Sequence, residues 1–245
     1  MHDDHLDDKT MKSFKLFLEE VLAEYRHPLH SVYITGSLLT ADFDPKLSDI
    51  NSVFVLNRMD LQFLSVLAPL GKKYGKKGIA APLIMTPDYI KRSLDVFPIE
   101  FLNLKQLHHK VLGEDIFQDI KIERTDLRYQ CERELKVKLM GLRQAYIRSA
   151  GDRKVLSENI ISSIPAYIPL CRAVIFLLGK APPGSNEEVL AALQEMTKID
   201  IGAFQRVLRH KKERSRLSLE ELDALFRDYY HATEKLGEII DAAVA

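Results

Sequence analysis

The feature that most constrains this chain of 245 residues is a change in the spacing of its apolar residues near residue 120. Up to Asp119, short apolar segments typical of strands are mixed with helical ones. From Asp126 onward, apolar residues recur every three or four positions, as on one face of a helix. We therefore predict an α+β chain, with a mixed-sheet domain over residues 1–120 followed by an all-α helical bundle domain over residues 121–245.

The first part contains four segments whose composition favours strands. They are residues 31–35, 51–56, 79–85 and 99–104. Three helices are expected around these strands. One is capped by Thr10, one covers residues 61–70, and one starts at Thr86-Pro87, where Pro occupies the first helical position.

The second part has longer helical periods. An apolar stripe over residues 127–146 predicts one helix of about seven turns. Capping boxes at residues 185–188 and 218–221 each precede an apolar run and predict two further helix starts. The Ala-Pro-Pro-Gly segment at residues 181–184 predicts a break between helices.

Charge is balanced over the chain, with 35 Lys and Arg side chains against 35 Asp and Glu side chains. This balance excludes a polybasic arm or an acidic tail and argues against specific nucleic-acid binding. Residues 1–120 nevertheless carry 14 basic and 17 acidic side chains, whereas the rest carry 21 and 18. Basic stretches at residues 71–78, 121–154 and 206–216 are either solvated faces or surfaces that face an anion.

The location that we predict is the cytoplasm. The first eight residues are acidic and contain no apolar core, so no secretory signal is expected. Two cysteines, Cys131 and Cys171, are too few for a disulfide framework and favour a reducing compartment. The most apolar stretch, residues 166–178, contains Pro169 and Arg172 and is shorter than the roughly 20 residues that cross a bilayer. It therefore predicts a buried helix and no membrane partner.

The segment from residue 33 to residue 56 carries the candidate site, because a Gly-Ser turn and two polar side chains lie between its two expected strands. Gly36 permits close approach of the backbone, and the hydroxyl of Ser37 follows at the expected start of a short helix, where a phosphate can bind. Asp49 and Asn51 are two residues apart at the start of a strand, so both side chains leave the same face.

A third oxygen-bearing group lies further along the chain. Glu100 falls within the strand expected at residues 99–104, and it reaches the face of Asp49 and Asn51 if the two strands are neighbours. Carboxylate and amide oxygens are ligands that suit Mg²⁺, together with water and substrate phosphates. The sequence therefore predicts a magnesium and phosphate site.

This order of residues resembles the nucleotidyltransferase superfamily, whose members carry Gly-Ser, then Asp-x-Asp, then a third carboxylate. The resemblance is specific over residues 30–56 and looser up to residue 150. It implies that Gly36 and Ser37 bind a nucleotide, that Asp49 and Glu100 are catalytic, and that both hold Mg²⁺ together with Asn51. The expected ligand or substrate is a nucleoside triphosphate.

Asn51 departs from the pattern, because the superfamily has its second aspartate at this place. An asparagine offers a carbonyl oxygen but no negative charge. One hypothesis is a degenerate member that binds a nucleotide or a partner protein with weak or no turnover. The alternative is an active enzyme that moves a nucleoside monophosphate from the triphosphate to a small-molecule or macromolecular acceptor. The sequence leaves the acceptor and a homodimer open.

Overall fold

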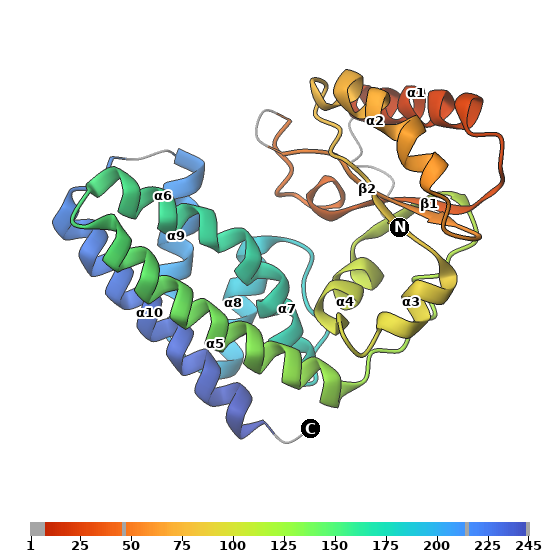
Figure 1. Cartoon of the computed structure of the whole chain (residues 1–245). Helices are drawn as coiled ribbons and strands as arrows, with labels where there is room; N and C mark the ends of the chain where they lie inside the picture. Colours follow the sequence, from red (N-terminus) through yellow and green to blue (C-terminus); the bar gives the residue numbers. More distant parts are fainter. Residues whose placement is uncertain (1–7, 46–47, 214–215, 244–245) are drawn as a thin grey trace. The chain divides into compact units, whose positions relative to one another are not determined.

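The computed structural model describes residues 8–45, 48–213 and 216–243 and divides the chain into two units (Figure 1). The first unit consists of residues 1–95 and 101–121, and the second consists of residues 96–100 and 122–245. Glu100 is therefore grouped with the helical unit. Residues 1–7, on which the expectation of a missing secretory signal largely depends, lie outside the described residues.

A four-stranded sheet of order β3-β2-β1-β4 forms the centre of the first unit, and the prediction of a mixed sheet is confirmed. β1 (Leu29–Thr35) pairs antiparallel with β2 (Asn51–Leu56) on one side and with β4 (His108–Gly113) on the other. β2 pairs in parallel with β3 (Leu83–Met85). The strand predicted at residues 51–56 is confirmed with the same bounds. Its five residues after Asn51 are all buried and are apolar or small, as expected for an interior strand.

Two helices, α1 (Asp8–Glu24) and α2 (Leu61–Gly75), pack against one face of this sheet. Side chains alternate along a strand, so Val32 and Ile34 point to this face while Tyr33 and Thr35 point to the other. The core on the helical side includes Phe14, Phe17 and Val21 from α1, Phe63 and Leu67 from α2, and Val32, Ile34, Phe54 and Leu56 from the strands. The candidate site lies at the end of β1, beyond this core.

Two short helices complete the first unit. α3 (Pro87–Ser93) starts as predicted, because the Thr86 side chain accepts a hydrogen bond from the Tyr89 backbone N–H at 3.1 Å and Pro87 follows the cap. α4 (Pro98–Gln106) begins in the second unit and ends in the first. The strand predicted over residues 99–104 is therefore wrong. A short apolar run fits either type of element, and Pro98 at the start with Glu100 in the first turn favours a helix.

Two other predictions for the first unit need correction, and one strand was missed. Thr10 lies inside α1, which begins at Asp8, so Thr10 is not its cap. Within residues 79–85 only Leu83–Met85 forms a strand, while Ile79 makes an isolated bridge to Ile50. Pro82, which has no backbone N–H, precedes the strand. β4 was not predicted, because its residues are half-buried or exposed and do not alternate clearly.

The second unit consists of helices, as predicted. They are α5 (Arg124–Ser149), α6 (Arg153–Ser163), η3 (Ile164–Ala166), α7 (Tyr167–Leu177), α8 (Asn186–Thr197), α9 (Gly202–Glu213) and α10 (Leu219–Ala242). The long helix predicted over residues 127–146 is confirmed by α5. Both capping boxes are present, at Ser185 before α8 and at Ser218 before α10, and the predicted break separates α7 from α8.

The apolar stretch of the second unit is a core element. Among the described residues, Arg153–Leu177 is long and apolar enough to cross a membrane by length and composition, but most of it is buried inside the structure. In α7, nine of eleven residues are buried. The buried Arg172 guanidinium donates to the carbonyl oxygens of Pro183 and Gly184. The loop between α7 and α8 therefore supplies the hydrogen-bond acceptors that this buried charge requires. The prediction of a buried helix is confirmed.

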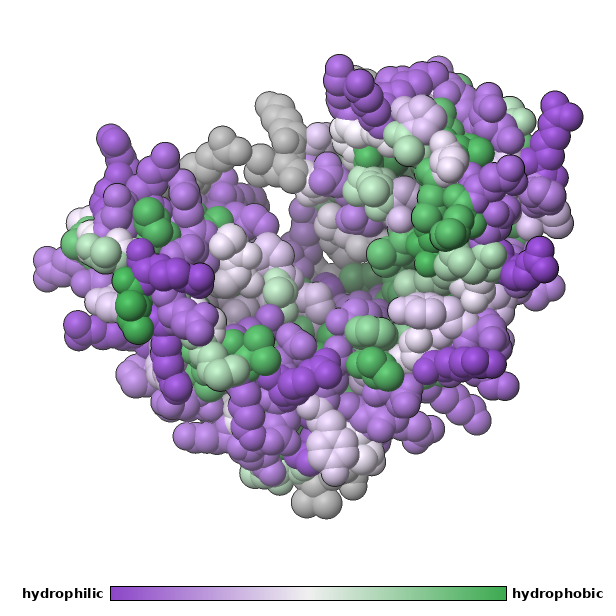
Figure 2. All heavy atoms as spheres, in the orientation of Figure 1, coloured by the Kyte–Doolittle hydropathy of each residue, from purple (hydrophilic) through white to green (hydrophobic). Residues whose placement is uncertain are grey.

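The drawn face of the second unit is largely hydrophilic, with apolar side chains along α5 (Figure 2). Val137, Met140 and Ile147 are 50%, 54% and 75% exposed. Charged side chains accompany them, and Glu132 pairs with Arg128 at 3.2 Å and also with Lys136. This pairing is typical of a solvated helix face.

The buried His210 makes the stability of the second unit sensitive to acid. Its Nε2 lies 2.8 Å from Ser157 Oγ, and burial lowers its pKa. Because the unfolded chain takes up this proton at a higher pH than the folded chain, the contribution to the free energy of unfolding is complete above about pH 6.5 and is lost as the pH falls below it. We expect His210→Gln to reduce this loss in denaturant titrations across the range.

The exposed His231 provides the control for this measurement. His231→Gln makes the same chemical change at a position where the side chain is 67% exposed. Equal acid sensitivity of the wild type and His210→Gln would contradict the assignment to His210.

Candidate functional site

The Gly-Ser turn follows β1 directly and has a backbone that only glycine adopts readily. Gly36 has a φ of +80°, and its N–H donates to the Leu107 carbonyl oxygen at 3.2 Å. Ser37 belongs to the four-residue 3-10 helix η2 (Gly36–Leu39), whose end is closed by Thr40. The Thr40 backbone N–H and hydroxyl both donate to the Ser37 carbonyl oxygen at 3.0 Å. The turn is therefore ordered by its own hydrogen bonds.

Asn51 lies beside this turn because β1 and β2 are in register. Thr35, the last residue of β1, is paired with Asn51, the first residue of β2. A side-chain carbon added to Gly36 would lie 3.6 Å from the Asn51 amide nitrogen Nδ2. The same amide donates weakly, at 3.4 Å, to the Asp49 carbonyl oxygen. The first unit thus brings Gly36, Asp49 and Asn51 to one end of the sheet.

The side chains of Asp49 and Asn51 are both exposed, and Ser37 is half-buried. The first unit therefore offers a carboxylate, an amide and a hydroxyl near one turn of backbone. Among the described residues, no group of three or more His, Cys, Asp or Glu side chains could hold a metal ion. One carboxylate and one amide oxygen fit a single Mg²⁺ whose other ligands are water and phosphate.

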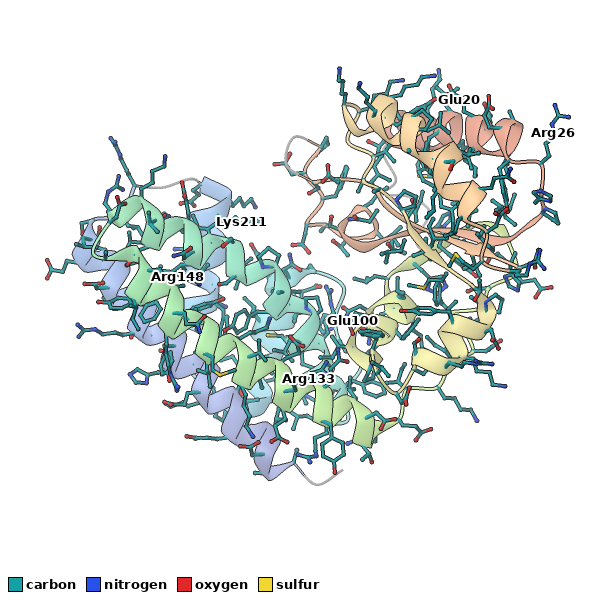
Figure 3. All side chains as sticks on the ribbon, viewed as in Figure 1. Glu20, Arg26, Glu100, Arg133, Arg148 and Lys211 are labelled. Atoms are coloured by element: carbon teal, nitrogen blue, oxygen red, sulfur yellow. The ribbon has the colours of Figure 1, made fainter. Side chains whose placement is uncertain are left out.

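Glu100 belongs to the other unit and to a helix, so the argument that neighbouring strands bring it to Asp49 is wrong. It lies in the first turn of α4 and is exposed (Figure 3). Its Oε2 accepts a hydrogen bond from Gln130 Nε2 at 2.8 Å, and Gln130 Oε1 accepts from the Ile99 backbone N–H at 2.7 Å. The second unit thus presents one carboxylate that is tied to α5.

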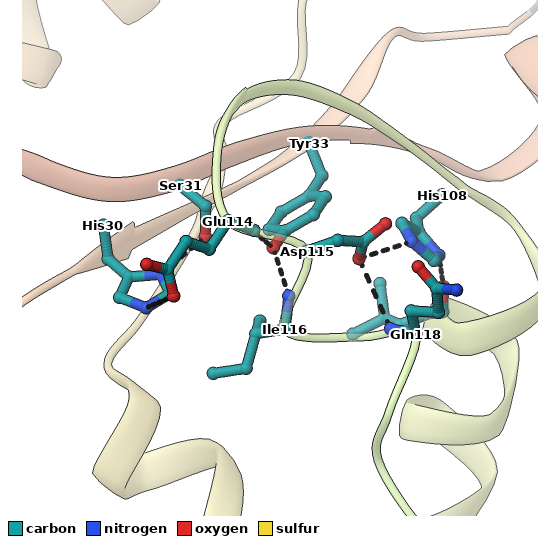
Figure 4. A network of polar contacts seen from close by, with 9 residues as sticks. His30, Ser31, Tyr33, His108, Glu114, Asp115, Ile116 and Gln118 are labelled. Carbon is teal, nitrogen blue, oxygen red and sulfur yellow. Dashed lines mark hydrogen bonds and ion pairs between the residues drawn. The ribbon is translucent and has the colours of Figure 1, made fainter.

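A polar network within the first unit joins β1 and the start of β4 to the loop that follows β4 (Figure 4). His108 starts β4 opposite Thr35, and the preceding residue, Leu107, accepts the Gly36 N–H. The His108 ring nitrogens lie 2.7 Å from the Leu104 carbonyl oxygen and 2.9 Å from Asp115 Oδ1. His108 therefore connects the end of α4 to the loop that follows β4.

Tyr33 holds the same loop from β1. Its hydroxyl donates to the Glu114 carbonyl oxygen and accepts from the Ile116 N–H at 2.8 Å. Burial raises the pKa of Tyr33, so the hydroxyl stays a donor. The sequence did not point to this network, since Tyr33 reads as an ordinary strand residue and the strand that carries His108 was not predicted. Its members meet only through the pairing of β1 with β4.

We expect the Gly36 conformation to be testable by a pair of glycine substitutions. Gly36→Ala forces a side chain into the left-handed region and should lower the free energy of unfolding by about 1–2 kcal/mol. Gly71→Ala, inside α2 with no atom within 4 Å of the added carbon, should raise it by about 0.5–1 kcal/mol. Chemical denaturation measures both, and a neutral Gly36→Ala would show that the turn adapts.

Comparison with known proteins bears on the fold. No protein-family model and no curated protein matches the sequence. A solved structure that does match is the crystal structure of spectinomycin adenyltransferase AAD(9) from Enterococcus faecialis with ATP and spectinomycin. The two chains are 13% identical with a TM-score of 0.58, and the match covers 93% of this chain and 98% of that one. This chain therefore has the fold of that enzyme, a nucleotidyltransferase-like mixed-sheet domain followed by a helical domain.

Proposed function

We propose that this protein binds a nucleotide at the Gly36-Ser37 turn, beside Asp49 and Asn51, with weak or no turnover. The observation that carries the proposal is the placement of the Asn51 amide against Gly36, in a fold shared with an adenyltransferase that was solved with ATP. Gly36 has no side chain and therefore allows a phosphate to approach the backbone, and Ser37 adds a hydroxyl next to it.

The asparagine is the reason for proposing weak turnover. An aspartate at this position would add a negative charge, worth roughly 4 kcal/mol towards a unit charge about 4 Å away at an effective dielectric of about 20. Asn51 supplies only a neutral oxygen. In this proposal Asp49 and Asn51 hold one Mg²⁺ on the nucleotide phosphates, and the second ion of a two-metal centre is not held.

The alternative is an active Mg²⁺-dependent nucleotidyltransferase that moves a nucleoside monophosphate from a triphosphate to an acceptor. The observation that favours it is Glu100, which is exposed and yet tied to Gln130. Here Asp49 and Glu100 are the catalytic carboxylates, and both bind the metal together with Asn51. The solved neighbour contains spectinomycin, which supports a small-molecule acceptor.

The proposal also covers the roles of the two domains, the partners and the location of the protein. Residues 1–120 and 121–245 act as a nucleotide domain and an acceptor or partner domain, respectively. A protein partner or a second copy of the chain is compatible with either function. The cytoplasm remains the proposed location, and the two cysteines, both free and buried, agree with it.

Calorimetric titration with ATP and other nucleoside triphosphates, with and without Mg²⁺, tests the proposal. We expect the wild type to bind in a Mg²⁺-dependent manner and Asp49→Ala to lose that dependence, because Asp49 is the charged ligand. Asn51→Asp should strengthen Mg²⁺-dependent binding. Release of pyrophosphate by Asn51→Asp alone would show that the asparagine silences the chemistry, whereas release by the wild type would favour the active enzyme.

Asp95→Ala is the matched control, since it removes an exposed carboxylate of the first unit outside the site. It should bind as the wild type does. If the wild type binds no nucleotide under either condition, both nucleotide functions are wrong.

A further inference from the structure

We infer that the Thr35 hydroxyl is a further binding group at the Gly36 turn and that it donates a hydrogen bond to a phosphate oxygen of the ligand. The inference rests on the proposed binding of a nucleotide phosphate at this turn. Thr35 is the last residue of β1 and directly precedes Gly36. Both residues, and the groups that surround them, belong to the first unit.

The Thr35 side chain is buried, and its hydroxyl has no partner. Only 7% of Thr35 is exposed. A threonine in front of a helix usually accepts a hydrogen bond from the first backbone N–H groups, but the Thr35 side chain makes no such bond to η2. No other hydrogen bond joins its hydroxyl to a residue that the structure describes. Because a buried hydroxyl without a partner costs free energy, such a group calls for a partner that is not part of the chain.

The pairing of β1 determines the direction in which Thr35 points. Thr35 is opposite Asn51 of β2 and opposite His108 of β4, so the three side chains leave the same face of the sheet. This face is the one turned away from α1 and α2. The ring nitrogens of His108 are already occupied, because they lie 2.7 Å from the Leu104 carbonyl oxygen and 2.9 Å from Asp115 Oδ1 (Figure 4).

Three donors lie at the turn where Gly36 leaves room for a ligand. A side-chain carbon on Gly36 would lie 3.6 Å from the Asn51 amide nitrogen, so this amide borders the space that glycine keeps open. The half-buried Ser37 follows Gly36 in the chain. The side chains of Thr35, Ser37 and Asn51 are neutral and can donate, which suits the oxygens of a phosphate. The exposed Asp49 carboxylate opposes an anion that arrives without a cation, so binding is measured with and without Mg²⁺.

Thr35→Val removes the hydroxyl and keeps the shape of the side chain. We expect it to weaken the binding of ATP and of inorganic tripolyphosphate roughly tenfold in calorimetry, as for a lost hydrogen bond to a charged group, by the same factor with and without Mg²⁺. Tripolyphosphate tests the phosphate contact alone, because it has neither base nor ribose. Thr35→Ser keeps the hydroxyl and should bind both ligands as the wild type does.

Ser52→Ala is the matched control. Ser52 Oγ is also buried without a partner among the described residues, but Ser52 is paired with Ile34 and points to the opposite face, towards α1 and α2. Thr35→Val and Ser52→Ala should both raise Tm, because each removes a buried hydroxyl that has no partner. Only Thr35→Val should weaken ligand binding. A Tm of Thr35→Val below that of the wild type would show that the hydroxyl has a partner in the free protein and would overturn the inference.

The two ligands separate the inference from the proposed function. If the wild type binds ATP and Thr35→Val binds it equally well, the inference is overturned and the proposed function stands. Weaker binding of ATP but not of tripolyphosphate by Thr35→Val would overturn the contact with phosphate. If tripolyphosphate is bound and Thr35→Val weakens it, while no nucleotide is bound, the proposed function is wrong and the inferred phosphate contact stands. A wild type that binds neither ligand overturns both.

Discussion

The antiparallel pairing of β1 with both β2 and β4 is the constraint on which the first unit depends. Val32, Tyr33 and Ile34 in the middle of β1 are fully buried, so the strand cannot shift by one residue without moving polar groups into the core. The register that results places Thr35 opposite both Asn51 and His108. Gly36 follows Thr35 and therefore lies beside the Asn51 amide of β2, while its N–H donates to the carbonyl oxygen of Leu107, the residue before β4.

The functional groups are built by two separate local arrangements. In the first unit, the turn at Gly36 and the start of β2 supply a hydroxyl, a carboxylate and a neutral amide. In the second, α5 presents Glu100 through Gln130. Each arrangement is held by backbone hydrogen bonds and buried side chains within its own unit. The surroundings of Asn51 and the orientation of Glu100 are therefore set independently of each other.

The sequence assigned some of the candidate site residues, but not all of them, to the correct type of secondary structure. The turn at Gly36, the strand that starts at Asn51 and the helix that carries Gln130 were all predicted, because each has a strong local signal. These signals are a Gly-Ser after an apolar strand, a short apolar run that contains Val and Phe, and a long apolar stripe, respectively. Glu100 was assigned to a strand because Ile-Glu-Phe-Leu is a short apolar run that fits either type of element. Its helix is stabilised by Gln130, thirty positions away along the chain.

Local sequence was enough to specify the two-part α+β architecture, the long helix and both capping boxes, since periodicity and capping act over a few residues. Only the tertiary structure decided that β4 completes the sheet, that His108 and Tyr33 bind the loop that follows β4, and that Gln130 holds Glu100. These contacts join residues far apart in the chain. Their energy comes from strand pairing and from buried donors that need acceptors, and neither leaves a periodic signal in the sequence.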